Sequence, residues 1–144
     1  MADFDDDYED FVDTSIPARS EYELNAGIQD RSNQVRGFVS SGRFAEAVAK
    51  ALEDPPAGRD AQGAKDKNLQ VVMEALAAPR GTDIPVIVKQ LAPYQLDTLM
   101  KFVYRGMAYP EAFNPSVLLT WHEKVTEVTG LGSIVRVLTD RQTV

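Results

Sequence analysis

The chain has 144 residues, no cysteine and a formal net charge of −7 at pH 7. This length is enough for one domain with a sizeable core, and the lack of cysteine excludes disulfides, thiolate metal sites and a cysteine nucleophile. No apolar run approaches the ~20 residues that a membrane-spanning helix needs, and the acidic N-terminus is unlike a secretory signal. We therefore expect a soluble cytosolic or nuclear protein.

The acidic residues gather at the N-terminus. Residues 1–24 contain nine acids and one base, whereas residues 25–144 contain 13 acids and 14 bases. We therefore predict an acidic, flexible tail over residues 1–26 and a nearly neutral helical domain over residues 27–144. Nucleic acid is a disfavoured partner, because the tail would repel phosphates and the domain has no large basic excess.

Aromatic side chains are interleaved with the acids of this tail, three or four residues apart, at Phe4, Tyr8 and Phe11. One interpretation is a tail that only keeps the protein soluble. The other is a segment that becomes ordered on a partner whose apolar pockets are bordered by Lys or Arg. The aromatic residues favour the second interpretation, because a purely solubilising segment has no use for them.

The apolar pattern after the tail is helical throughout. Apolar residues recur at helical spacing, and Pro or Gly separates the segments; we expect helices over residues 28–41, 43–53, 64–78, 82–91 and 93–105. Asn114 and Pro115 predict the start of a sixth helix. Gly130 and Gly132 predict a tight turn, after which Ser133 is expected to cap a last helix with Ile134, Val137 and Leu138 on one face.

These segments predict an all-α fold. About seven short helices would pack as antiparallel pairs, in a bundle or a short α–α superhelix. Residues 42–52 and 81–91 resemble each other weakly at an offset of 39 residues, which supports stacked helix pairs without making a repeat array. Such architectures are typical of scaffolds that bind other proteins.

The motifs that suggest chemistry are incomplete. His122 is the single histidine, and Thr126 stands where a zinc hydrolase motif needs its second histidine. The Gly130–Gly132 turn follows a predicted helix, whereas a dinucleotide fingerprint follows a strand. The acids over residues 3–13 lack the central glycine and terminal glutamate of an EF-hand. We predict no catalytic residue, cofactor or metal, and therefore not an enzyme.

Four stretches together resemble one known family. They are AVAKALEDPP at 47–56, LDTLMKFVYRGM at 96–107, WHEK at 121–124 and GSIVRVLT at 132–139. In content, order and spacing they resemble subunit 5, the 16-kDa subunit, of the actin-related protein 2/3 complex. The resemblance runs from about residue 34 to the end, and the tail is similar in character only.

The resemblance implies a non-catalytic structural and regulatory subunit of a complex that nucleates branched actin filaments in the cytoplasm. It implies a helical body that docks on the WD-repeat propeller subunit and on subunit 4. It also implies an N-terminal tail that tethers actin-related protein 2, with contact to the actin filament through the complex and no membrane or nucleic acid partner. ATP is bound by the actin-related subunits in this family, so no cofactor is expected here.

The expected partner-binding residues fall into two groups. In the tail, apolar anchors and steering acids are expected at Phe4, Asp5, Asp6, Asp7, Tyr8, Asp10 and Phe11. In the C-terminal signature, four residues would serve either the core or a subunit interface: Trp121, His122, Arg136 and Arg141. Two other hypotheses stay open: a free-standing tetratricopeptide-like adaptor that binds peptides in a groove, and a small enzyme that uses carboxylates alone.

Overall fold

The computed structural model describes residues 19–57, 61–140 and 144, and these form helices and no strand. The helices are α1 (Glu21–Ser40), α2 (Phe44–Ala51), α3 (Gln62–Ala77), α4 (Ile84–Gln90), α5 (Pro93–Met107), α6 (Pro115–Thr129) and α7 (Gly132–Thr139). For this part of the chain, the prediction of an all-α fold with about seven helices is confirmed.

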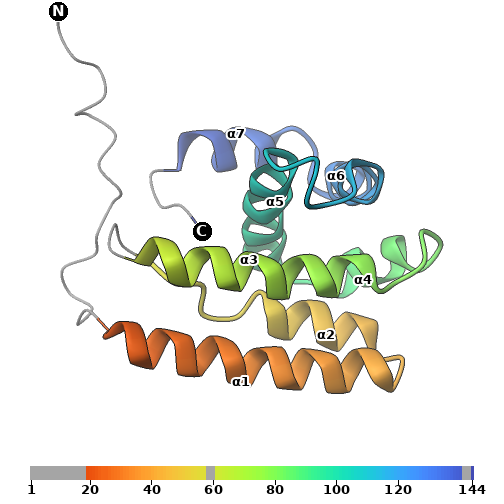
Figure 1. Ribbon diagram of the computed structural model, residues 1–144. Coiled ribbons are helices and arrows are strands. Elements are labelled where there is room, and N and C mark those ends of the chain that lie inside the picture. The colour runs from red at the N-terminus through yellow and green to blue at the C-terminus, as the bar shows by residue number, and fades with distance from the viewer. Residues whose placement is uncertain (1–18, 58–60, 141–143) are drawn as a thin grey trace, which may run out of the picture.

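The helices form two groups with α3 between them (Figure 1). On one side of α3 lie α1 and α2, which are joined by a tight turn at Gly42, a residue with φ of +75°. On the other side, α5 crosses behind α3 at a steep angle, and it carries α6 and α7. The short α4 contacts α2 and α6 and so closes the open end between the two groups.

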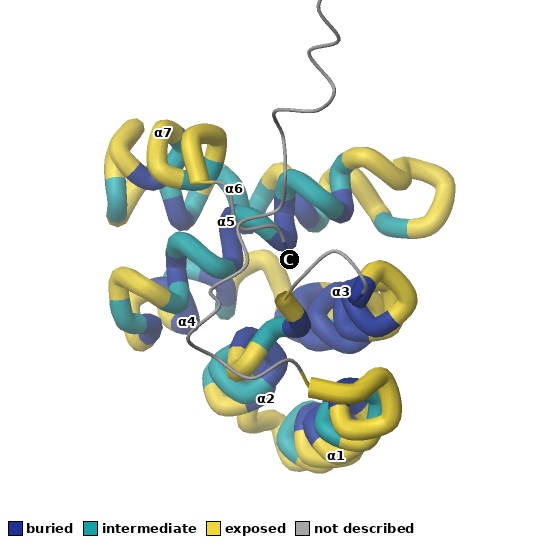
Figure 2. The backbone as a smooth tube through the Cα atoms, turned by 90° about the vertical axis from the view of Figure 1, so that its left-hand side faces the viewer, coloured by how far each residue is buried: buried dark blue, intermediate teal, exposed yellow. Residues whose placement is uncertain are grey.

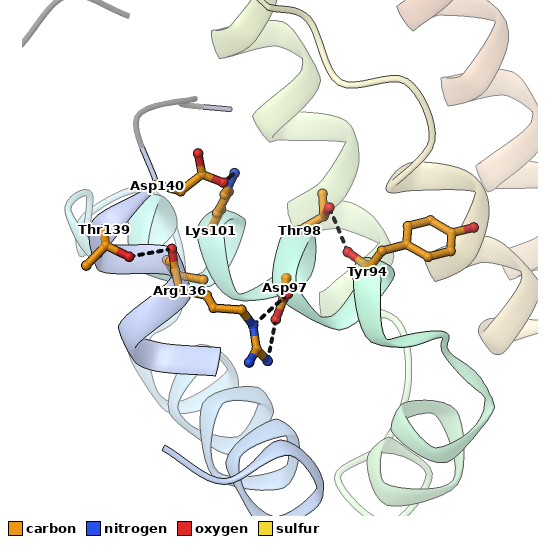
Figure 3. Close-up of a pocket in the computed structure, with 8 residues that line it drawn as sticks. Tyr94, Asp97, Thr98, Lys101, Arg136, Thr139 and Asp140 are labelled. Carbon is orange, nitrogen blue, oxygen red and sulfur yellow. Dashed lines mark hydrogen bonds and ion pairs between the residues drawn. The ribbon is translucent and has the colours of Figure 1, made fainter. Parts of the chain in front are cut away.

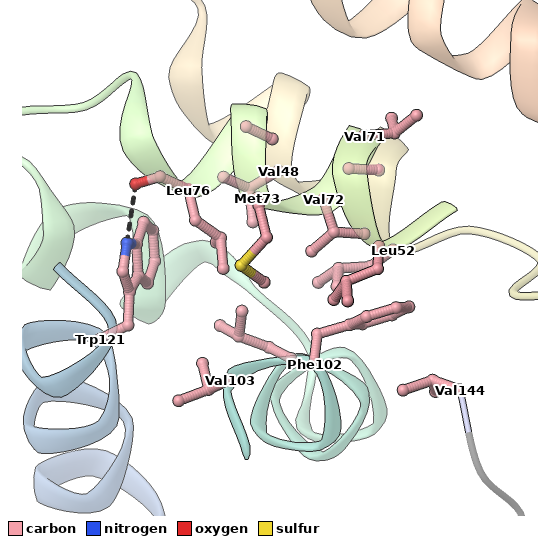
Figure 4. Packing of buried hydrophobic residues seen from close by; sticks show 14 of the residues in the cluster. Val48, Leu52, Val71, Val72, Met73, Leu76, Phe102, Val103, Trp121 and Val144 are labelled. Carbon is pink, nitrogen blue, oxygen red and sulfur yellow. Dashed lines mark hydrogen bonds between the residues drawn. The ribbon is translucent and has the colours of Figure 1, made fainter. Parts of the chain in front are cut away.

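The core follows from this central position of α3. Its residues Leu69, Val72, Met73 and Leu76, which the sequence predicts to point inward, are all buried. Figure 2 shows the buried positions of α3 facing the neighbouring helices on both sides. Figure 4 shows Phe102 of α5 directed at the same cluster. One continuous apolar core therefore joins the two groups of helices.

Gly106 marks the closest approach between helices. A Cβ atom at this position would lie 2.9 Å from Sδ of Met73 on α3 and 3.0 Å from Cδ1 of Leu118 on α6. Both neighbouring side chains are buried. Glycine is therefore required here because there is no room for a side chain, although the backbone conformation is that of an ordinary helix.

Helix α1 begins at Glu21, seven residues before the expected start. The hydroxyl of Ser20 accepts a hydrogen bond from the backbone N–H of Glu23 at 3.2 Å, which caps the helix. Glu21 and Glu23 lie in the first turn, where the helix dipole favours negative charge. Leu24 is buried, so residues 21–26, which composition assigns to the tail, are the first turns of a packed helix.

The start of α7 also differs from expectation. Ser133 is not the capping residue: the helix begins at Gly132, and Ser133 is fully buried inside its first turn. The Thr129 hydroxyl at the end of α6 donates a hydrogen bond to the Ser133 hydroxyl at 2.7 Å. Gly130, with φ of +69°, makes a turn tight enough to bring these two side chains together.

Candidate interaction surface of the C-terminal helices

Helix α6 is fixed to the body through its tryptophan. Asn114 accepts a hydrogen bond from the N–H of Ser116 at 3.0 Å and so caps the helix, as its sequence predicts. Trp121 is fully buried, and its indole N–H donates a hydrogen bond to the Leu76 carbonyl at 2.9 Å (Figure 4). Leu76 lies in the last turn of α3, where carbonyl groups lack helical partners. The structure therefore places Trp121 in the core.

His122 lies beside Trp121 but faces α5. Its Nε2 is 2.8 Å from the hydroxyl of Tyr104, and the two rings meet edge to face with centroids 5.4 Å apart. The imidazole is half-buried. This contact joins α5 to α6, so the single histidine holds two helices together through one hydrogen bond and one aromatic contact.

Three polar contacts join α5 to the C-terminal segment. Arg136 donates two hydrogen bonds to the carboxylate of Asp97, at 2.9 and 3.1 Å. One turn further along α5, Lys101 pairs with Asp140 at 2.6 Å. These α5 residues line a shallow groove of about 440 Å³ with α7 (Figure 3).

The third contact lies another turn along α5. Arg105 donates to the main-chain oxygen of Val144 at 2.7 Å and also pairs with Asp66 of α3. Each of the three contacts joins residues 39 positions apart. Arg136, Asp140 and Val144 therefore meet α5 in chain order, from its first turns toward its last. We call these three contacts the α5 ladder.

The electrostatics of the groove follow from this pairing. The hydrogen bonds to Asp97 raise the pKa of Arg136, whose side chain is otherwise exposed to solvent. The charges of Asp97, Arg136, Lys101 and Asp140 are satisfied within the groove. It therefore offers little free charge to a small ligand, and its polar groups hold the last helix in place.

A separate polar contact, outside the α5 ladder, joins α1 to α3. A guanidinium nitrogen of buried Arg31 donates to Oδ1 of buried Asn68 at 3.2 Å, while Nε of Arg31 and Nδ2 of Asn68 have no hydrogen-bond partner among the described residues. Burial lowers the pKa of Arg31, and the nearby carboxylate of Asp54 opposes this shift.

The remaining expected site residues lie outside the described part of the chain. These are the tail residues Phe4, Asp5, Asp6, Asp7, Tyr8, Asp10 and Phe11, and Arg141 in the C-terminal signature. In the part of the chain that is described, no three His, Asp or Glu side chains gather in a way that could hold a metal ion. No helix in that part is long and apolar enough to cross a membrane.

The partners of the signature residues are not evident from the sequence, because they lie far along the chain. Tyr104, Asp97 and the Leu76 carbonyl meet their partners 18, 39 and 45 residues away. A signal for two of the ladder contacts exists in the sequence: Asp97 and Lys101 precede Arg136 and Asp140 by the same interval, with opposite charges.

By fold and site, the chain is a small all-helical domain whose C-terminal helices are joined to the body by paired polar side chains and a buried tryptophan. The profile of one protein family, described as ARP2/3 complex 16 kDa subunit (p16-Arc), matches residues 2–144. The chain therefore belongs to this family, and the resemblance found in its sequence motifs is confirmed.

Individual relatives agree with the family match. Actin-related protein 2/3 complex subunit 5 of Dictyostelium discoideum is 35% identical over 136 residues, covering 94% of this chain and 97% of the relative. The subunit 5 of Saccharomyces cerevisiae is 39% identical over 118 residues, covering 81% and 76%. The subunit 5-like protein of Homo sapiens is 38% identical over 112 residues, covering 78% and 73%.

Proposed function

We propose that the chain is a non-catalytic, structural subunit of the actin-related protein 2/3 complex, which nucleates branched actin filaments. The observation that carries this proposal is the family match over residues 2–144, together with relatives that bear the name of subunit 5. In this role the chain holds other subunits in position and works in the actin cytoskeleton of the cytoplasm.

The two parts of the chain have different tasks in this proposal. The helical body docks on the WD-repeat propeller subunit and on subunit 4. The tail tethers actin-related protein 2, because its acids and interleaved aromatics suit a segment that orders on a partner. A tether keeps that partner at a high effective concentration while still letting it move during activation.

Purification at native expression level tests the assembly. The chain has a mass of 15.9 kDa, and we expect it to elute with the propeller subunit, subunit 4 and both actin-related proteins in one large complex. Elution as a free protein of its own mass would contradict the proposal. That result would favour the adaptor hypothesis, which expects a stable monomer that captures peptides.

The tail is best tested by deleting residues 1–18. The structure sets this boundary, because Arg19 pairs with Asp54 and Ser20 caps α1. We expect the truncated chain to stay folded and to remain in the complex through its body. It should lose its hold on actin-related protein 2, measured as the fraction of that subunit retained after dilution. Full retention would contradict the tethering role.

The chemistry of the tether is tested by substitution. Changing Phe4, Tyr8 and Phe11 to Ala should weaken the hold on actin-related protein 2 more than changing three tail acids to their amides. Exposed charges contribute little at physiological ionic strength, whereas buried aromatic anchors retain their effect. The reverse order would show that charge dominates the contact.

A further inference from the structure

Two guanidinium groups approach one carboxylate beside α1. Arg19, where the described chain begins, donates a hydrogen bond to Oδ2 of Asp54 in the loop after α2. Nη1 of Arg31 in α1 lies 4.0 Å from the same oxygen. The side chains of the first pair are 38% and 59% exposed, whereas that of Arg31 is 9% exposed. Asp54 is therefore shared between the residue that follows the tail and a buried cation of the body.

The buried guanidinium of Arg31 is incompletely paired. It donates to Oδ1 of Asn68 on α3 at 3.2 Å, but its Nε has no hydrogen-bond partner among the described residues, and its Nη1 is too far from Asp54 for a hydrogen bond. Burial lowers the pKa of Arg31, Asp54 raises it, and the charge of nearby Arg19 lowers it. A carboxylate at hydrogen-bond distance would therefore stabilise Arg31 more than it stabilises exposed Arg19, whose pair is screened by water.

The backbone of Asp54 is held in an unusual conformation. Within the described part of the chain, it is the one residue other than glycine that has a positive φ, at +47°. Asp and Asn tolerate this left-handed conformation better than other side chains do. Strain of this kind persists only where the surroundings hold the residue in place. Here the two guanidinium groups on either side of one carboxylate do so.

We propose that Asp54 is a switch, which transfers its carboxylate from Arg19 to Arg31 when the tail binds a partner. This inference rests on the proposed tethering role of the tail. In the free chain the two guanidinium groups compete for the carboxylate and repel each other. A partner that holds residues 1–18 draws Arg19 away, and the Asp54 side chain then rotates across the 4.0 Å gap to accept a hydrogen bond from Nη1 of Arg31.

The balance of contacts favours this transfer. The exposed pair that is lost contributes little to stability, whereas a charged hydrogen bond to a buried group contributes more. Arg31 also donates to Asn68 of α3, so its new partner strengthens the contact between α1 and α3. Binding of the tail would therefore tighten the packing of α1 on the body instead of loosening it.

Arg19→Gln in the free full-length chain tests the switch without a partner. If Arg19 and Asp54 form an ordinary surface pair, the melting temperature falls slightly and Arg31 does not respond. The switch predicts that the melting temperature does not fall. It also predicts that the guanidinium hydrogens of Arg31 exchange with water roughly tenfold more slowly, measured by nuclear magnetic resonance. Unchanged exchange at Arg31 would overturn the proposal.

Two further variants make this test specific. Arg43→Gln removes another exposed arginine, which pairs with Glu46 at 3.0 Å, and should leave exchange at Arg31 unchanged. Asp54→Asn keeps a residue that tolerates the backbone conformation but removes the charge, so it should speed exchange at Arg31. Adding Arg19→Gln to Asp54→Asn should then no longer slow that exchange, because both changes act through one carboxylate. Independent, additive effects would overturn the proposal.

The role of the tail is tested in the assembled complex. Complexes that contain the full-length chain or the chain lacking residues 1–18 differ only in the tail. The backbone amides of α1 around Arg31 should exchange more slowly in the first complex, measured by hydrogen–deuterium exchange and mass spectrometry. Equal exchange would overturn the link between the switch and the tail. If the deletion leaves retention of actin-related protein 2 unchanged, the tether itself is refuted, and this outcome is separate from the response of Arg31 in the free chain.

Discussion

Replacing Trp121 by Phe measures how much the core depends on this one side chain. The indole is fully buried and donates its N–H to the Leu76 carbonyl at 2.9 Å. Phenylalanine leaves that carbonyl without a partner in a dry site, at a cost of about 1–3 kcal/mol. The smaller ring also loses contacts and leaves a cavity, at a further cost of roughly 1–2 kcal/mol. We expect a total loss of about 2–5 kcal/mol in the free energy of unfolding.

Urea denaturation followed by far-ultraviolet circular dichroism measures this loss. Circular dichroism is needed because the substitution removes the single tryptophan of the chain, and with it the tryptophan fluorescence. Tyr104→Phe is the control: it removes a hydrogen bond to half-buried His122, so we expect a loss of about 1 kcal/mol or less. A loss below about 1 kcal/mol for Trp121→Phe would refute the reasoning and return Trp121 to the list of interface residues.

Two further predictions concern the packing of the body. Gly106→Ala should destabilise the chain by about 1 kcal/mol, because the added methyl group displaces two buried side chains. Gly37→Ala, which has no atom within 4 Å of the new methyl group, should stabilise α1 by about 0.5–1 kcal/mol. Equal effects at both positions in a denaturation experiment would contradict this. Deleting residues 1–18 should leave the melting temperature unchanged, whereas deleting residues 1–24 should lower it, because it removes the cap of α1 and buried Leu24. Identical melting of both truncations would show that the first turn of α1 is not part of the folded body.

A helix boundary can be predicted from the sequence where a proline in the first turn or a capping residue marks it. Pro93 opens α5, and Asn114 with Pro115 opens α6, as their sequence positions indicate. The start of α1 was missed because Glu21 and Glu23 share the composition of the tail. In the structure these same acids stabilise the first turn of a helix.

The candidate surface was less predictable, because it depends on contacts between distant residues. Trp121 and His122 are adjacent in sequence, yet one is buried under α3 and the other meets Tyr104 on α5. Leu138 has the spacing of an inward residue, yet it is exposed. The side of α7 that faces the body is set by the contacts of the α5 ladder, which the apolar periodicity of the sequence cannot show. The side of a short apolar helix that faces the core is therefore decided by its neighbours.

The α5 ladder gives the last helix a different kind of attachment from that of the others. Ser133 is the one residue of α7 that is fully buried, so apolar burial holds α7 less firmly than it holds α3. Two of its contacts with α5 are ion pairs at the surface, and such pairs weaken as the Debye length falls from ~10 Å at 0.1 M salt to ~3 Å at 1 M. The backbone amides of α7 should therefore exchange with deuterium faster in concentrated salt, while those of α3 keep their protection.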